Sequence, residues 1–225
     1  MRMDIASAKQ ETACFTGHRY LQPAQTAYLA SKIPLSLEMA YRQGIRTFLC
    51  GGALGFDTMA AQAVLLFRQF RPDVRLVIAV PCPGQAACWS GEDRRRYRQI
   101  LASADQTVLV SDHYDSDCMH RRNRFMVDAS SLLISYVTQF RGGAWYTLRY
   151  AMQQGLPVIN LAISDLVEDE SQYRLKEEIC SCMSTFLSAF ENAGTVISSP
   201  SRCRKVKIRH ISGTCFRKRG TDHRM

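Results

Sequence analysis

Long apolar runs and targeting segments are both missing from this sequence. No stretch approaches the roughly 20 consecutive apolar residues that a membrane-spanning helix needs, and the first residues, Met1 to Glu11, are mixed and polar. They lack the apolar stretch of a secretion signal. We therefore expect a cytoplasmic protein that has no membrane partner.

The patterns of a disulfide framework and of a zinc finger are missing as well. There are nine cysteines, but an odd number without a secretion signal favours reduced thiols. Cys14 and Cys50 lie inside apolar runs, and we expect them to pack as small hydrophobic side chains. The two cysteines and two histidines after residue 200 are separated by seven, five and eight positions, which fits no familiar zinc finger. We expect no metal site and no required cofactor.

Acidic residues are scarce in one segment of the chain only. Residues 202–225 contain nine lysines and arginines against one aspartate, whereas residues 1–201 carry 20 basic and 19 acidic side chains. The net charge of +9 therefore belongs mainly to the C-terminal segment. Such a segment is suited to contact the phosphates of a nucleic acid, although a solvated appendage without a partner is the simpler interpretation.

The sequence does contain an alternation of short apolar runs with helix-like segments. The runs are continuously apolar, as expected for strands that are covered on both faces. The predicted strands are Thr12–Thr16, Thr47–Cys50, Arg75–Val80, Thr107–Ser111, Leu132–Val137 and Pro157–Ala162. The predicted helices are Leu35–Gln43, Asp57–Gln69, Glu92–Ala102, Arg122–Ser130 and Thr147–Gln154. This alternation predicts an α/β, Rossmann-like three-layer fold with a mainly parallel sheet of about six strands.

The pattern changes after Ala162. Apolar side chains from Ile179 to Phe190 recur at helical spacing, which predicts a C-terminal amphipathic helix that packs on the sheet. No periodicity follows Asn192. We therefore predict one domain over residues 1–195 and a basic, disordered tail over residues 196–225.

Polar residues follow the first predicted strand. Ligands of an open α/β sheet bind at the carboxyl ends of its strands, and this strand exits into Thr16, Gly17, His18 and Arg19. Gly17 allows a ligand to approach the backbone closely. Arg19 can pair with a phosphate, and His18 can donate to an oxyanion or a base. A plain turn with solvated side chains is the alternative.

A glycine-rich turn follows the second predicted strand. Gly51, Gly52 and Gly55 precede a predicted helix, and the free amides and positive dipole of a helix start favour an anion. The spacing is neither that of the dinucleotide fingerprint nor that of a P-loop. Because a carboxylate would repel a phosphate, we assign Asp57 to sugar hydroxyls, with a helix-capping role as the alternative.

Two later segments add to this edge of the predicted sheet. A candidate anion clamp stands near a helix start, although a charged, solvated helix face also explains it. It consists of Arg121, Arg122, Asn123 and Arg124. Gly142 and Gly143 form a second strand–Gly-Gly–helix junction, which continues to Thr147. Two such junctions would place two sets of amides around one crevice.

These segments together resemble the YpsA-like family of the SLOG superfamily, which also contains DprA and the LOG-type phosphoribohydrolases. The segments that carry the resemblance are Thr16–Arg19, Phe48–Asp57, Arg122–Asp128, and Gly142–Gly143 with Thr147. The resemblance covers about residues 12–162. It implies a Rossmann-like fold with a nucleotide-type ligand over the glycine turns.

One departure from the superfamily concerns catalysis. LOG-type enzymes carry a Pro-Gly-Gly-x-Gly-Thr segment that is followed closely by a catalytic glutamate. The matching segment here, Arg141–Tyr150, has no carboxylate after Thr147. The general acid/base of glycosidic-bond cleavage in that style is therefore missing.

Three functions remain, and we favour the first, a binding module rather than an enzyme. It is the binding or sensing of a nucleotide or a derivative such as ADP-ribose. The second is a hydrolase that acts on a nucleotide or its N-glycosidic bond, with Asp57 or Asp128 as the catalytic acid or base. The third is DprA-like binding of single-stranded DNA, in which the basic tail contacts phosphates. An oligomer is compatible with all three.

Overall fold

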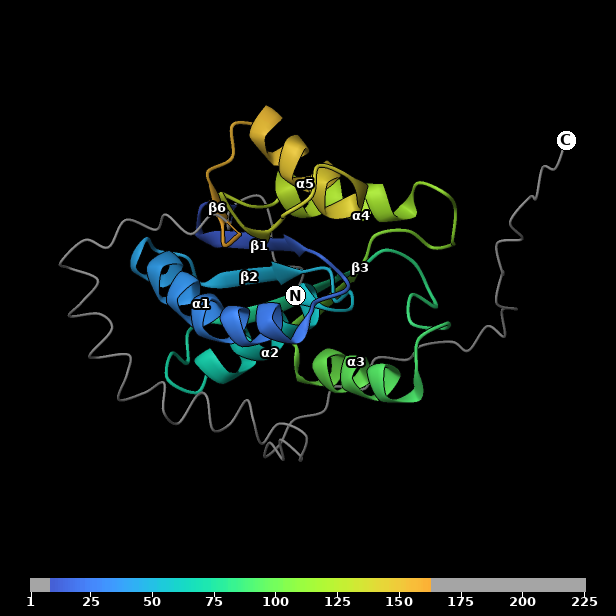
Figure 1. Ribbon diagram of the computed structural model, residues 1–225, viewed down its shortest axis with the longest axis horizontal. Coiled ribbons are helices and arrows are strands. Elements are labelled where there is room, and N and C mark those ends of the chain that lie inside the picture. The colour runs from blue at the N-terminus through green and yellow to red at the C-terminus, as the bar shows by residue number, and fades with distance from the viewer. Residues whose placement is uncertain (1–8, 163–225) are drawn as a thin grey trace, which may run out of the picture.

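The computed structural model describes residues 9–162, which form a sheet with helices on both faces (Figure 1). The strands are β1 (Thr12–Gly17), β2 (Thr47–Cys50), β3 (Arg75–Val80), β4 (Gln106–Leu109), β5 (Leu132–Tyr136) and β6 (Val158–Asn160). The α-helices are α1 (Pro23–Arg42), α2 (Phe56–Phe67), α3 (Gly91–Ser103), α4 (Cys118–Asp128) and α5 (Gly142–Gln153). The predicted C-terminal helix, the basic tail and the domain boundary at residue 195 lie outside the described residues.

The sheet is parallel throughout, with the strand order β4-β3-β2-β1-β5-β6. From β1 the chain moves outward strand by strand to β4 and then returns to β5, on the other side of β1. Helices α1, α2 and α3 therefore cover one face and α4 and α5 the other, as Figure 1 shows. This confirms the predicted α/β, Rossmann-like fold. The strand order reverses between β1 and β5, which is where such sheets bind ligands.

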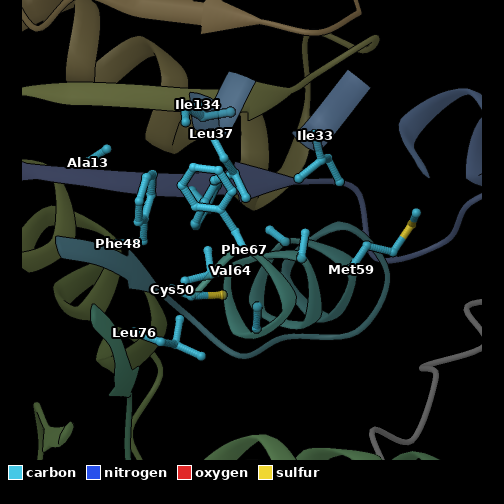
Figure 2. Packing of buried hydrophobic residues seen from close by; sticks show 14 of the residues in the cluster. Ala13, Ile33, Leu37, Phe48, Cys50, Met59, Val64, Phe67, Leu76 and Ile134 are labelled. Carbon is cyan, nitrogen blue, oxygen red and sulfur yellow. The ribbon is translucent and has the colours of Figure 1, made fainter. Parts of the chain in front are cut away.

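Each face of the sheet has its own hydrophobic core. Successive residues of a strand point to opposite faces, so Phe15 packs in the core under α1 and α2 while Cys14 packs in the core under α4 and α5. Figure 2 shows the first core, where Phe48 and Cys50 of β2 lie near Val64 of α2. Cys14 and Cys50 are free and fully buried, as predicted. Among the described residues, no helix is long and apolar enough to cross a membrane.

The first helix is longer than predicted. The predicted helix begins at Leu35, but α1 starts at Pro23 and contains Pro34 in its interior. Leu29, Ile33 and Leu37 lie one turn apart and are buried together, and this packing offsets the backbone hydrogen bond that an interior proline removes. Helices α4 and α5 also start several residues earlier than predicted, at Cys118 and Gly142.

Candidate functional site

The exits of β1 and β2 are packed directly against each other. The backbone N–H of Phe56 donates to the carbonyl of His18 at 3.0 Å. Gly55 has φ = +72°, and a Cβ atom there would lie 2.5 Å from the carbonyl oxygen of His18. A Cβ atom on Gly17 would lie 2.5 Å from the Cβ atom of Phe56. Both positions therefore require glycine, and the start of α2 is fixed beside Arg19.

The Gly51–Gly52 turn is held from beneath by two side chains. Arg122 Nη1 donates to the carbonyl of Gly51 and, at 3.5 Å, to that of Ala79. Gln85 Nε2 donates to the carbonyls of Gly51, at 3.2 Å, and of Gly52, at 3.1 Å. The turn is thus tied to α4 and to the loop after β3.

Asp57 and Arg122 are both buried against Gly51. A Cβ atom on Gly51 would lie 2.7 Å from Asp57 Oδ2 and would overlap the guanidinium of Arg122. Asp57 Oδ2 accepts from the N–H of Ala53 at 3.3 Å. Burial raises the pKa of Asp57, and the charges of Arg122 and Arg19 together with this hydrogen bond oppose the rise.

This arrangement differs from the open clamp that we expected of Arg122 and Asn123. The Arg122 side chain is buried with its guanidinium on protein carbonyls, and Asn123 Oδ1 accepts from Arg122 Nε at 2.9 Å. Both residues therefore support the turn. A run of charges is usually solvated, but here one arginine lies beneath the glycine turn because it supplies the donors that the turn carbonyls need.

His18 joins the exits of β1 and β5. Its Nε2 accepts from the backbone N–H of Thr138 at 2.9 Å and lies 3.0 Å from the Thr138 hydroxyl. The ring meets Tyr136 edge to face. Partial burial lowers the pKa of His18, and an Nε2 that accepts a hydrogen bond places the proton of the neutral ring on Nδ1. His18 is therefore a neutral bridge across the point where the strand order reverses.

Arg19 is the one predicted arginine that remains open. Its side chain is exposed and makes no hydrogen bond or ion pair with residues 9–162. It lies close enough to Asp57 and Arg122 to influence the pKa of both. An exposed, unpaired guanidinium beside a helix start is the arrangement that an anion favours.

The second glycine junction is open. Gly142, with φ = +79°, and Gly143 are exposed, and a Cβ atom on either would meet no atom of residues 9–162 within 4 Å. Thr147 is buried instead, and its hydroxyl donates to the carbonyl of Gly143 at 2.8 Å. Thr147 therefore completes the first turn of α5. Thr16 is buried within β1, opposite Ser135.

Asp128 lies away from this group of residues. It is the last residue of α4, which ends just before β5 begins, and the chain there bonds to the start of β1 through Ser131 N and Thr12 O. Asp128 Oδ1 accepts from the Tyr150 hydroxyl at 2.9 Å. It is at the amino edge of the sheet, whereas Asp57 is at the carboxyl edge. The predicted acid or base Asp128 therefore lies at the opposite edge of the sheet from the glycine turns.

Two residues of the site were not predicted. Gln85 comes from a loop without secondary structure, and nothing in the sequence marks it. Tyr97 of α3 covers Gly52, where a Cβ atom would lie 3.0 Å from Tyr97 Cε2. Burial raises the pKa of Tyr97 to about 12, so its hydroxyl is neutral. Gly52 has φ = +60°, and its surroundings are less crowded than those of Gly51 and Gly55.

Comparisons with known proteins show which family this chain resembles. The sequence model of the YspA SLOG family matches residues 18–163. A UPF0398 protein of Bacillus velezensis is 28% identical over 153 residues, which cover 64% of this chain and 84% of that protein. The UPF0398 protein YpsA of Bacillus subtilis is 28% identical over 154 residues, covering 64% and 86%.

Two solved structures share the fold. DNA processing protein A from Helicobacter pylori, described for its single-stranded DNA binding mode, superposes with a TM-score of 0.52 at 15% identity and covers 84% of each chain. DprA from Streptococcus pneumoniae has a TM-score of 0.50 at 20% identity, with 75% of this chain and 57% of that chain covered. At these identities the likeness concerns the fold alone.

Proposed function

The chain belongs to the YspA SLOG family, and from this starting point we propose that it binds or senses a nucleotide or a nucleotide derivative such as ADP-ribose. The observation that carries the proposal is the contact of Gly55 with the exit of β1. It brings the start of α2 against the backbone of His18 and Arg19, and the exposed Arg19 side chain makes no hydrogen bond or ion pair with residues 9–162. A helix start and an open arginine together favour a phosphate group.

The buried charges beneath the turn support this assignment. Arg122 lies next to Asp57 and offsets its negative charge, so the carboxylate does not repel a phosphate at the outer face. Asp57 already accepts from Ala53 and is 6% exposed. We therefore assign Asp57 to holding the turn rather than to direct contact with sugar hydroxyls.

The test is calorimetric binding of AMP and of ADP-ribose to the full chain and to Arg19→Ala. Loss of a charged hydrogen bond to phosphate weakens binding by roughly tenfold or more. Arg149→Ala is the matched control, because Arg149 is also an exposed arginine but stands in the second half of α5. If Arg19→Ala binds both ligands as tightly as the parent, the phosphate does not lie at this turn. If the parent binds neither, the proposed function is wrong.

The hydrolase alternative retains Asp57 as its candidate catalytic acid or base at the glycine turns. Burial raises the pKa of Asp57, which is a property of catalytic carboxyl groups. With Asp128 at the other edge, however, this carboxyl has no partner for acid–base chemistry among the predicted residues. We expect no product above a heat-killed control when AMP or ADP-ribose is incubated with the protein and separated by chromatography. Release of adenine or ribose 5-phosphate would favour the hydrolase.

Single-stranded nucleic acid is the second candidate ligand, and the charge of residues 202–225 is the observation that favours it. The proposal makes these basic side chains the phosphate contacts. Binding would then fall steeply with salt and would be lost on deletion of residues 200–225. If oligonucleotide binding survives the deletion unchanged, the tail is not the contact.

A further inference from the structure

An aromatic ring stands open on the loop between β5 and α5. Phe140 is 84% exposed and belongs to neither hydrophobic core. The ring is not isolated, because Trp145 in the first turn of α5 meets it at 5.0 Å between ring centroids and an angle of 85°. The indole therefore supports Phe140 while leaving most of its surface to solvent.

The position of this loop connects Phe140 to the proposed site. Strands β1 and β5 pair so that Gly17 lies opposite Tyr136. Just beyond this pair, His18 Nε2 accepts from the N–H of Thr138. Phe140 follows two residues later, so its loop leaves the sheet at the point where the strand order reverses, beside the exit that leads to Arg19.

The surroundings of Phe140 are polar or lack side chains. The exposed residues around it in sequence are Thr138, Gln139, Arg141, Gly142 and Gly143. A Cβ atom on either glycine would meet nothing within 4 Å, so the space before α5 is free. A protein partner would require a wider apolar surface. One flat ring in a polar setting is suited to a flat, polar-edged group.

We propose that Phe140, supported by Trp145, stacks on the base of the bound nucleotide. This inference rests on the proposed function and extends it, because it names the part of the ligand that the β5–α5 loop contacts. Stacking accepts any base, since each has a π-face. A purine presents more ring surface than a pyrimidine, so AMP is expected to bind more tightly than CMP.

The test compares a ligand that has a base with one that lacks it. Binding of AMP and of ribose 5-phosphate is measured by calorimetry for the full chain, Phe140→Ala and Phe140→Tyr. Removal of one stacking ring lowers affinity by roughly tenfold. Phe140→Ala is therefore expected to lower the affinity for AMP about tenfold and to leave the affinity for ribose 5-phosphate unchanged. Phe140→Tyr is expected to keep the affinity for AMP. Phe70→Ala is the control, because Phe70 is also exposed but follows α2 at the amino edge.

Each outcome decides between the two proposals. If Phe140→Ala binds AMP as the parent does, or loses both ligands equally, the stacking role is wrong while the proposed function stands. If the parent binds neither ligand, the proposed function is wrong, and the stacking role is refuted together with it.

A spectroscopic measurement adds an independent check. The chain has two tryptophans, so Trp89→Phe leaves Trp145 as the reporter. AMP is expected to change the emission of Trp145, ribose 5-phosphate is not, and the change is expected to disappear in Phe140→Ala. Equal changes with both ligands would contradict stacking on the base.

Discussion

Two glycine turns with the same sequence pattern have different physical roles in this protein. In the β2–α2 turn, each of Gly51, Gly52 and Gly55 has a neighbour at 3.0 Å or less from the position of a Cβ atom. In the β5–α5 turn, Gly142 and Gly143 have none within 4 Å. The first turn uses glycine because the chain is packed there, and the second leaves an open surface. A strand–Gly-Gly–helix pattern therefore identifies a turn but not its role.

The largest expected effect separates these two turns directly. Gly55→Ala combines a positive φ with a clash against the backbone carbonyls of His18 and Arg19, and we expect a loss of about 4 kcal/mol in the free energy of unfolding. Gly143→Ala lies inside α5 with free space around it, so we expect it to be neutral or stabilising by up to about 1 kcal/mol. Urea denaturation measures both variants. Similar losses would show that the two turns are packed alike.

A second experiment concerns the support beneath the packed turn. Arg122→Met leaves the carboxylate of Asp57 without its main counter-charge, and we expect a loss of about 3 kcal/mol in the free energy of unfolding. Arg124→Met is the comparison, because Arg124 pairs with Asp117 at the surface and is expected to matter much less. Calorimetric melting of both variants checks this. Equal losses would mean that Arg122 contributes no more to stability than a surface arginine.

The pH dependence of stability tests the buried Asp57 carboxyl group without removing Arg122. Its pKa is raised in the folded protein, so the folded state favours the protonated form, and the native chain loses stability as pH rises through the folded pKa. Asp57→Asn keeps an acceptor for Ala53 and does not titrate. We expect its stability relative to the parent to increase between pH 3.5 and 7 in urea denaturation. A difference in stability that does not change with pH would contradict a raised pKa of the buried Asp57 carboxyl group.

The smallest expected effect lies at the bridge between the two turns. The pKa of His18 is lowered by burial, so the folded state favours the neutral ring and loses stability as pH falls below about 6.5, the unfolded value. Protonation also removes the acceptor that Thr138 uses. His18→Gln does not titrate, so its unfolding free energy is expected to change less between pH 8 and 5. If the unfolding free energies of the parent and of His18→Gln change with pH in parallel, the neutral His18–Thr138 contact is contradicted.

The fold could be predicted from the sequence because buried parallel strands are continuously apolar. The six runs correspond to β1–β6, and the glycine turns fall at their carboxyl ends. The placement of Asp128 could also have been deduced, since the end of a helix that crosses between parallel strands lies at the amino edge. The prediction did not take this direction into account.

Other features of the site were not accessible from sequence. The charge pattern of Arg121, Arg122 and Arg124 gives no sign of which side chain is buried, because burial depends on the carbonyls that α4 faces after folding. Gln85 is an ordinary loop residue until the carbonyls of Gly51 and Gly52 are located beside it. Such contacts join segments far apart in the chain.

The open space before α5 has a practical consequence for protein engineering. Gly142 has φ = +79° and disfavours other residues, whereas Gly143 has no such restriction and no crowding around it. New side chains can therefore be introduced at position 143 without refolding the domain. A small library at that one position offers a route to alter the ligand preference of the proposed site while the crowded glycines of the β2–α2 turn remain untouched.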